Sequence, residues 1–259
     1  MSGKHVVLTG ASAGLGFEAA VDLLDAGASL TLVIRDPTKV ATMQAALLER
    51  TGRQADQVEL ADLSLLNQVN ALSQRLLSAN KPIDVLINNA GALFNDYCQT
   101  SEGIEMSVAL LLLSPWRLTE ALHPLLAGHD TPARVINVVS GGMYTQKLQC
   151  ASLVMSADDY RGSVAYARAK RALTVLTELW SAQWQDDHIV VNAMHPGWAD
   201  TPGVQGALPG FRRLTQRVLR SSQEGADTIV WLARAREADK TSGQLFLDRE
   251  PRTTHLRQR

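Results

Sequence analysis

The sequence predicts an α/β fold in which a doubly wound parallel sheet of about seven strands carries helices on both faces. Apolar runs of strand length alternate with helix-length periodic stretches along the whole chain. The expected strands are continuously apolar, which is typical of strands buried on both faces. The repeated strand-then-helix order favours right-handed crossovers between parallel strands.

Three elements open the chain. The run HVVLT predicts a strand at His5–Thr9, and SLTLVI predicts the next at Ser29–Ile34. Residues 15–26 between them have helical spacing, and Gly27 ends the helix because glycine tolerates the left-handed conformation of a C-cap. Together these elements predict the first crossover unit.

The middle of the chain repeats this order. Periodic apolar residues predict helices over 38–50 and 65–79, with a short strand at Gln57–Leu60 between them. The run IDVLI predicts a strand over 83–87, and residues 102–126 are expected to be mostly helical. The chain therefore continues as an α/β protein.

Two strands of the second half precede long irregular stretches. RVINVV predicts a strand over 134–139, IVVNAM predicts one at Ile189–Met194, and a long helix over 164–185 joins them. The irregular residues 141–163 and 197–220 each follow one of these strands. Ligands bind at the carboxyl ends of strands in open α/β sheets, so both stretches are expected to overhang the site.

The last elements are short. Ser221 and Glu224 form a capping-box pattern ahead of a helix that runs to about Ala235. A last strand is expected over 244–247. Residues 248–259 are predicted to form a flexible tail, because chain ends are commonly poorly ordered.

Composition narrows the classes of function. The 259 residues are 46% hydrophobic with a net charge of -1, and no linker or composition break divides them, so one domain over 1–259 is expected.

Nothing suggests a nucleic-acid partner. The apolar run 108–113 is too short to span a bilayer. Cys98 and Cys150 lie in no paired pattern, and the early first strand leaves no room for a signal peptide, so a cytoplasmic location is expected. Homo-oligomerisation stays open.

A glycine-rich turn follows the first strand. In Thr9-Gly10-Ala11-Ser12-Ala13-Gly14-Leu15-Gly16, the first glycine can turn the chain sharply out of the strand. The other two let the backbone approach a pyrophosphate, and the helix N-terminus offers free N–H groups. The alternative is a plain strand-to-helix turn. The position between strand and helix favours a Rossmann-type dinucleotide site.

Arg35 follows the second strand, where a dinucleotide site selects its cofactor. An acid there holds the ribose 2′-OH of NAD, whereas an arginine accommodates the 2′-phosphate of NADP. Arg35 therefore favours NADP(H) over NAD(H). Asp36 is adjacent and keeps NAD open, and a solvent-facing pair is the alternative to both.

Tyr166 and Lys170 lie four residues apart on the predicted long helix, and so on one face of it. A free tyrosine is a poor base at neutral pH, and a nearby ammonium is expected to lower its pKa. The pair could then move a proton to or from a carbonyl or alcohol oxygen while a nicotinamide moves the hydride. Alone, this spacing is common on exposed helix faces.

The context of this pair carries a family resemblance. The segment Asn88-Asn89-Ala90-Gly91 follows the fourth strand, Ser140 ends the fifth, and His195-Pro196-Gly197 follows the sixth, with Thr201 just beyond. In this order the features resemble the short-chain dehydrogenase/reductase family along nearly the whole chain. The stretches SGGM and HPGWADTPGV are similar to the dehydrogenase/reductase member 12 branch, and the 26-residue gap from Ser140 to Tyr166 resembles the retinol-dehydrogenase-like branch.

The resemblance implies roles for single residues. Tyr166 would be the acid/base, Lys170 would hold the cofactor ribose and tune Tyr166, and Ser140 would hydrogen-bond the substrate oxygen. The residues implied to bind the cofactor are Gly10, Ser12, Gly14, Leu15, Gly16, Arg35, Asp62, Leu63, Asn89, Ala90, Gly91, Tyr166, Lys170, Pro196, Gly197 and Thr201. No metal site is expected.

One departure from the family pattern affects the expected function. The usual fourth catalytic residue is an asparagine that shapes a helix kink for proton relay, and Leu111 stands at its position, with Pro115 as another source of a kink. The leading expectation is an NAD(P)(H)-dependent oxidoreductase acting on an apolar alcohol or carbonyl. The alternatives are a nucleotide-binding pseudoenzyme with weak or no turnover and, less favoured, a nucleotide-sugar epimerase, for which little chain remains after Lys170.

Overall fold

Eight strands form a single sheet with the order β3-β2-β1-β4-β5-β6-β7-β8 in the computed structural model, which describes residues 1–197 and 220–256. Every neighbouring pair is parallel except β7 and β8. The strands are β1 (His5–Thr9), β2 (Ser29–Ile34), β3 (Gln57–Leu60), β4 (Val85–Asn88), β5 (Ala133–Val138), β6 (Ile189–Met194), β7 (Leu245–Leu247) and β8 (Glu250–Arg252). The predicted doubly wound parallel sheet is confirmed.

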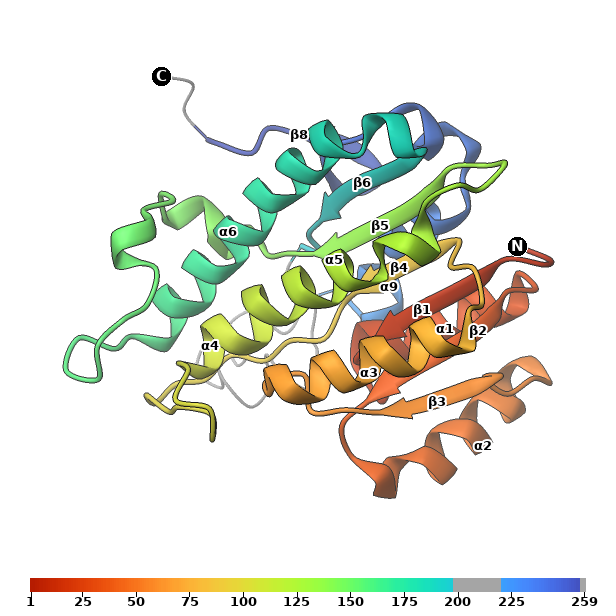
Figure 1. The fold of residues 1–259 in the computed structure, drawn as a ribbon, viewed down its shortest axis with the longest axis horizontal. Helices are drawn as coiled ribbons and strands as arrows, with labels where there is room; N and C mark the ends of the chain where they lie inside the picture. The colour runs from red at the N-terminus through yellow and green to blue at the C-terminus, as the bar shows by residue number, and fades with distance from the viewer. Residues whose placement is uncertain (198–219, 257–259) are drawn as a thin grey trace.

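Helices cover both faces of the sheet, with α3, α5 and α6 on the near face in Figure 1 and α1, α2 and α9 on the far one. The α-helices are α1 (Gly14–Asp25), α2 (Val40–Thr51), α3 (Leu66–Ala79), α4 (Met106–Val108), α5 (Ser114–Leu126), α6 (Gly162–Gln183) and α9 (Ser222–Arg234). Shorter helical turns are η1 (Pro37–Lys39), the π-helical η2 (Ala109–Leu113), η3 (Gly141–Thr145), η4 (Cys150–Ser152), η5 (Gln185–Asp187) and η6 (Arg236–Lys240). No helix within the described residues is long and apolar enough to cross a bilayer.

Burial on both faces of the sheet explains why the strands are apolar at every position. Val7 packs into the core beneath α3, α5 and α6, whereas Val6 and Leu8 pack into the core beneath α1, α2 and α9. All three are fully buried. Successive side chains point to opposite faces of a strand, so a strand covered on both faces must be apolar at every position.

The strand order reverses at β1, which pairs with β2 on one side and β4 on the other. The chain leaves these strands toward opposite sides, and a crevice forms outside their carboxyl ends. Thr9 ends β1 and Asn88 ends β4. The glycine turn and the segment after Asn88 therefore meet at this point.

The expectation that residues 102–126 are mostly helical is confirmed, and the structure adds two details. Glu105 ends the preceding turn by accepting the N–H groups of Ser107 and Val108, so the helix starts only at Met106. Five residues, Ala109–Leu113, then form a π-helical turn before α5. The capping box of Ser221 and Glu224 is confirmed at the start of α9.

The expected flexible tail over 248–259 is wrong for residues 248–256. Glu250–Arg252 adds an antiparallel strand to the sheet, after a tight turn in which Asp248 and Arg249 both have positive φ. Arg249 forms an ion pair with Asp227 on α9, and Asp248 forms one with Arg220. Pairing and charge together hold this segment on the domain. Residues 257–259 lie outside the described part.

Candidate active site

The glycine turn lies so close to neighbouring backbone atoms that side chains would not fit at two of its glycines. Gly10 has a φ of +72°, and a Cβ there would lie 2.8 Å from the Cα of Ala90. A Cβ on Gly16 would lie 2.3 Å from the carbonyl oxygen of Gly10. Gly14 also has a positive φ, of 58°. Larger residues would push the turn away from the segment after β4.

Hydrogen bonds fasten that segment to the turn. The hydroxyl of Thr9 accepts the N–H groups of Asn89 and Ala90, each at 3.0 Å. The amide of Asn89 donates to the carbonyls of Thr9 at 2.9 Å and Gly10 at 3.2 Å. Asn89 thus holds the turn in place. A Cβ on Gly91 would lie 3.7 Å from Lys170 Nζ, so the same segment reaches the predicted catalytic lysine.

The N-terminus of α1 suits an anion. Its N-cap, Ala13, makes no side-chain capping hydrogen bond, and the first turn holds no acidic residue. The orphan N–H groups of a helix start need acceptors, and phosphate oxygens are suitable ones. Ser12 and Leu15 flank this start and are partly buried. The glycine turn and uncapped helix therefore fit the pyrophosphate of a dinucleotide.

Arg35 and Asp36 differ in the hydrogen bonds that they make. The Asp36 carboxylate caps η1, accepting from the Thr38 N–H at 3.0 Å and the Thr38 hydroxyl at 2.6 Å. These bonds lower the pKa of Asp36. Arg35 is exposed and makes no hydrogen bond or ion pair with the described residues. The arginine is the one of the two that is available to a ligand.

Asp62 and Leu63 follow β3. The Asp62 carboxylate accepts from the N–H of Ser64 at 2.9 Å and from its hydroxyl at 2.7 Å, which closes a tight turn. Leu63 is 7% exposed and packs into the core below α3 and α5. Both residues lie at the carboxyl edge, at the end of the strand next to β2.

Ser140 leaves β5 and caps η3. Its hydroxyl oxygen accepts the N–H of Gly142 at 3.2 Å, and its carbonyl accepts the N–H of Met143 at 3.0 Å. Ser140 also lies near enough to Tyr166 for its hydroxyl to lower the pKa of the phenol. The structure thus joins two of the three predicted catalytic residues across 26 positions of sequence.

Tyr166 and Lys170 lie together on α6, with Lys170 Nζ 5.9 Å from the centroid of the Tyr166 ring. Lys170 is 3% exposed and donates to the carbonyl of Val138 at 2.6 Å. Burial lowers the pKa of Lys170 to about 8. Burial also raises the pKa of Tyr166, more than Ser140 lowers it. The expected lowering of the Tyr166 pKa by Lys170 is therefore wrong in direction, because desolvation dominates.

The π-helical turn lies opposite these residues. The N–H of Ser114 donates five residues back, to Ala109, and Pro115 has no N–H with which to continue an α-helical ladder toward Leu111. Leu111 is fully buried. A cavity of about 10 Å³ lies between the turn, Lys170 and the end of β1. That volume suits about one water molecule.

The end of β6 contributes His195, Pro196 and Gly197. His195 is buried, and its Nδ1 lies 3.4 Å from the N–H of Gly197, which is the donor. Gly197 has a φ of +71°, and a Cβ there would lie 3.3 Å from the guanidinium of Arg220. Thr201 lies outside the described residues. Across 1–197 and 220–256, no group of three His, Cys, Asp or Glu could hold a metal ion.

Sequence reasoning missed a buried polar chain beneath the site. The amide of Asn88 donates to Asn137 on β5 and to Thr119 on α5, each at 2.9 Å, and Asn137 donates to Thr177 on α6 at 2.9 Å. This chain of hydrogen bonds ties β4 and β5 to α5 and to α6, the helix that carries Tyr166 and Lys170. An asparagine inside a continuously apolar strand is a usable signal, because buried amides are nearly always hydrogen-bonded.

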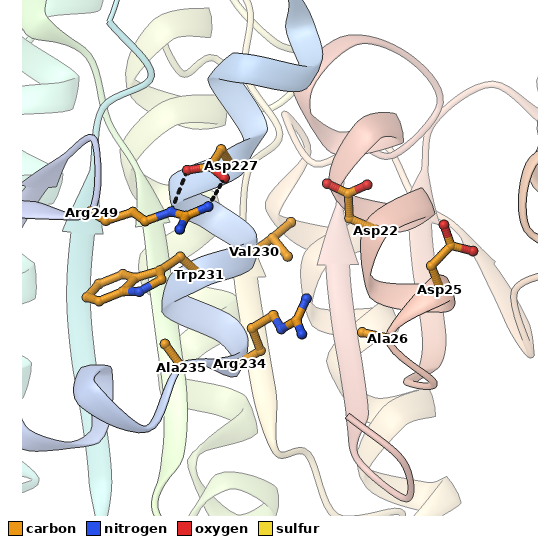
Figure 2. A pocket seen from close by; sticks show the side chains of 9 residues that line it. All are labelled: Asp22, Asp25, Ala26, Asp227, Val230, Trp231, Arg234, Ala235 and Arg249. Carbon is orange, nitrogen blue, oxygen red and sulfur yellow. Dashed lines mark hydrogen bonds and ion pairs between the residues drawn. The ribbon is translucent and has the colours of Figure 1, made fainter.

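A groove of about 570 Å³ lies elsewhere, between α1 and α9. Figure 2 shows Asp22 and Asp25 on one side and Arg234 on the other, with Asp227 and Arg249 paired above Trp231. Burial is the main reason that the pKa of Asp22 is raised. None of the described lining residues belongs to the predicted site.

Comparison with known proteins agrees with this geometry. The model of the short chain dehydrogenase family matches residues 4–209, and the chain therefore belongs to the short-chain dehydrogenase/reductase family of NAD(P)-dependent oxidoreductases. Over 255 residues it is 37% identical to dehydrogenase/reductase SDR family member 12 of Homo sapiens, covering 98% of this chain and 79% of that protein. It is 31% identical to retinol dehydrogenase 14 of Homo sapiens, covering 96% and 79% respectively. The solved RhlG/NADP complex of Pseudomonas aeruginosa superposes with a TM-score of 0.76 at 26% identity, covering 95% and 94%.

Proposed function

We propose that the protein is an NADP(H)-dependent enzyme that reduces an apolar aldehyde or ketone, or oxidises the corresponding alcohol. The observation that carries the proposal is the cluster of Ser140, Tyr166 and Lys170 beside an uncapped helix start and a glycine turn. Each part arises from the end of a different strand or from α6. Groups arranged in this way can bind a dinucleotide and protonate an oxygen at the same edge.

The chain's residues supply proton transfer and orientation. Because burial raises its pKa, Tyr166 stays protonated at neutral pH, which is the form that donates a proton to a carbonyl oxygen. Ser140 Oγ accepts from Gly142, and its one O–H is proposed to donate to the substrate oxygen when substrate lies beside Tyr166. Lys170 Nζ would hold the cofactor ribose. When bound, the nicotinamide supplies the hydride.

Cofactor preference follows from the end of β2. Asp36 is engaged with Thr38, whereas Arg35 is exposed and can pair with a 2′-phosphate. The remaining residues proposed to contact the dinucleotide are those of the glycine turn, the segment after β4, Asp62 with Leu63, and the segment from Pro196. Binding of NADP by the superposable Pseudomonas aeruginosa protein is in line with this preference.

The apolar substrate is supported by relatives rather than by a described pocket. One relative is named a retinol dehydrogenase, and retinol is an apolar alcohol. Met143, in the long stretch after β5, packs into the core. Trp198, Leu208 and Phe211 lie outside the described residues.

The π-helical turn supports activity without the asparagine. An irregular turn already exists at Leu111, and the adjacent cavity suits a water molecule between the turn and Lys170. We propose that this water relays protons toward Lys170. The competing candidate is a nucleotide-binding pseudoenzyme, favoured by the fully buried, apolar Leu111 itself.

A panel of carbonyls tests the proposal. NADPH oxidation is followed at 340 nm with benzaldehyde, decanal, cyclohexanone and all-trans-retinal, and NADPH affinity is measured separately by fluorescence. Turnover of at least one apolar carbonyl supports the enzyme. Tight NADPH binding with no turnover of any of them favours the pseudoenzyme, and no binding of either dinucleotide rejects both.

The organisation and location of the protein are also proposed. The described strands form one sheet with two helical layers, which supports a single domain over 1–259. Cys98 and Cys150 are both free, which supports a reducing compartment such as the cytoplasm.

A further inference from the structure

Arg171, the residue after Lys170, is a buried cation that the proposed chemistry does not use. It is 2% exposed and forms no ion pair with a carboxylate among the described residues. Its guanidinium instead donates to three backbone carbonyls: Thr254 at 2.6 Å, Met143 at 3.1 Å and Gln146 at 3.2 Å. Burying a charge in this way is costly, so the contacts need an explanation beyond filling space.

The three carbonyls come from two distant segments. Met143 and Gln146 belong to the turn that begins at Ser140, whereas Thr254 follows β8 near the end of the chain. Figure 1 shows the last described residues running past α6 after β8. Arg171 therefore joins the C-terminal segment to the turn that carries the proposed substrate-binding hydroxyl.

Tyr144 makes the same connection independently. Its hydroxyl donates to the carbonyl of Thr253 at 2.7 Å, and its ring lies 6.0 Å from the guanidinium of Arg171. The ring also meets His195 edge-on, with centroids 6.0 Å apart. The end of the chain is thus bonded both to α6 and to η3.

The turn has little freedom of its own. Met143 is fully buried, its sulfur accepts the hydroxyl of Thr174 at 2.9 Å, and its N–H bonds the carbonyl of Ser140. A shift of Met143 would pull directly on Ser140. Because the turn that follows Ser140 packs on α6, the helix that carries Tyr166, that shift would alter the catalytic geometry.

We propose that Arg171 is a positioning residue that, with the carbonyls of Thr253 and Thr254, fixes the Ser140 turn against Tyr166. The C-terminal segment 250–254 thereby becomes part of the active-site framework. The role of Ser140 in this inference rests on the proposed function. The hydrogen bonds from Arg171 to the C-terminal segment and to the Ser140 turn do not depend on it.

Two variants and one matched control test it. Arg171→Lys keeps the positive charge but removes the planar guanidinium that donates to three carbonyls. Tyr144→Phe removes only the hydroxyl that donates to Thr253. Arg53→Lys is the control, since Arg53 also donates to two backbone carbonyls, of Leu24 and Ala28, in a different part of the fold. Amide hydrogen exchange over 141–146, NADPH affinity, kcat and KM are measured for each.

We expect exchange over 141–146 to accelerate about tenfold or more in both variants, with exchange over 85–91 and NADPH affinity unchanged. For the carbonyl that the wild type reduces fastest, kcat should fall by about 10–100-fold. Arg53→Lys should change neither the exchange over 141–146 nor kcat. If Arg171→Lys does not fold, Tyr144→Phe carries the same test with a milder change.

Unchanged exchange over 141–146 in the folded variants would overturn the inference. Faster exchange with unchanged kcat and KM would also overturn it, because the connection would then stabilise the fold without positioning Ser140. If the wild type reduces no carbonyl, the proposed function fails, and the exchange comparison alone still decides whether Arg171 holds the turn.

Discussion

Burial moves the proton affinities of Tyr166 and Lys170 in opposite directions. It raises the pKa of the phenol and lowers the pKa of the ammonium to about 8, because each neutral form is favoured in a low-dielectric site. The sequence placed these residues four apart but gave no measure of their burial, so it predicted the wrong direction for Tyr166. A protonated tyrosine suits reduction of a carbonyl at neutral pH.

The lowered pKa of Lys170 predicts a pH-dependent stability. The folded state binds fewer protons than the unfolded state between the folded value of about 8 and the reference value of 10.5, so stability rises with pH across this window. Relative to Lys170→Met, the wild type should gain roughly 2–3 kcal/mol in unfolding free energy from pH 7 to pH 10. Urea unfolding of both proteins at pH 7 and pH 10 measures this gain. If the difference in unfolding free energy between the two proteins does not vary with pH, Lys170 is not a buried amine that titrates in this range.

Arg35 is predicted to select NADPH. Losing one charge-assisted contact with the 2′-phosphate should cost about 1.5–3 kcal/mol, so Arg35→Ala should weaken NADPH binding by about 10–100-fold and leave NADH nearly unchanged. Asp36→Ala is the control, because its carboxylate is engaged by Thr38, and it should preserve the preference. Equal affinities in the wild type would assign selection to Asp36 instead.

At the scale of elements, local signals predicted helix ends well. Gly27 after α1 and the capping box at Ser221 act through contacts within a few residues, so the sequence suffices to locate them. The π-helical turn could not be predicted, because α and π turns have nearly the same apolar spacing over five residues. Its position depends on Pro115 and on packing against α6.

Leu111→Asn tests whether that turn replaces the asparagine. We expect the variant to lose about 2–4 kcal/mol of stability, since an amide replaces a fully buried leucine, and to show no increase in kcat. Leu122→Asn on α5, also fully buried, controls for the loss of stability. Turnover that appears only in Leu111→Asn would mean that the wild type is a pseudoenzyme with a broken relay.

The glycine turn makes a second prediction at this scale. Gly16→Ala would place a Cβ 2.3 Å from a backbone oxygen, so the turn must move, at a cost of about 1–3 kcal/mol and at least tenfold in NADPH affinity. Gly52→Ala is the control for the loss of a glycine, because a Cβ there would meet nothing within 4 Å and its strain comes only from a φ of +68°. Equal loss of affinity in both variants would contradict the proposed pyrophosphate site.

For the whole molecule, a parallel sheet explains how distant residues converge. Gly10, Asn89, Ser140 and His195 each follow a strand, and the strands β1, β4, β5 and β6 are neighbours in the sheet. The sequence predicted this convergence because each motif stands directly after an apolar run. It could not predict β8, since Glu250–Arg252 is short, polar and contains a proline, and its pairing depends on distant contacts.

The most direct test of the account is the effect of Tyr166→Phe on turnover and on binding. Only the phenolic hydroxyl is removed, so NADPH affinity should stay within about twofold of the wild type while carbonyl reduction falls by about 10²–10⁴-fold. Lys170→Ala, measured beside it, should damage both properties, because Lys170 is proposed to hold the ribose as well. NADPH oxidation by Tyr166→Phe at the wild-type rate would contradict the mechanism.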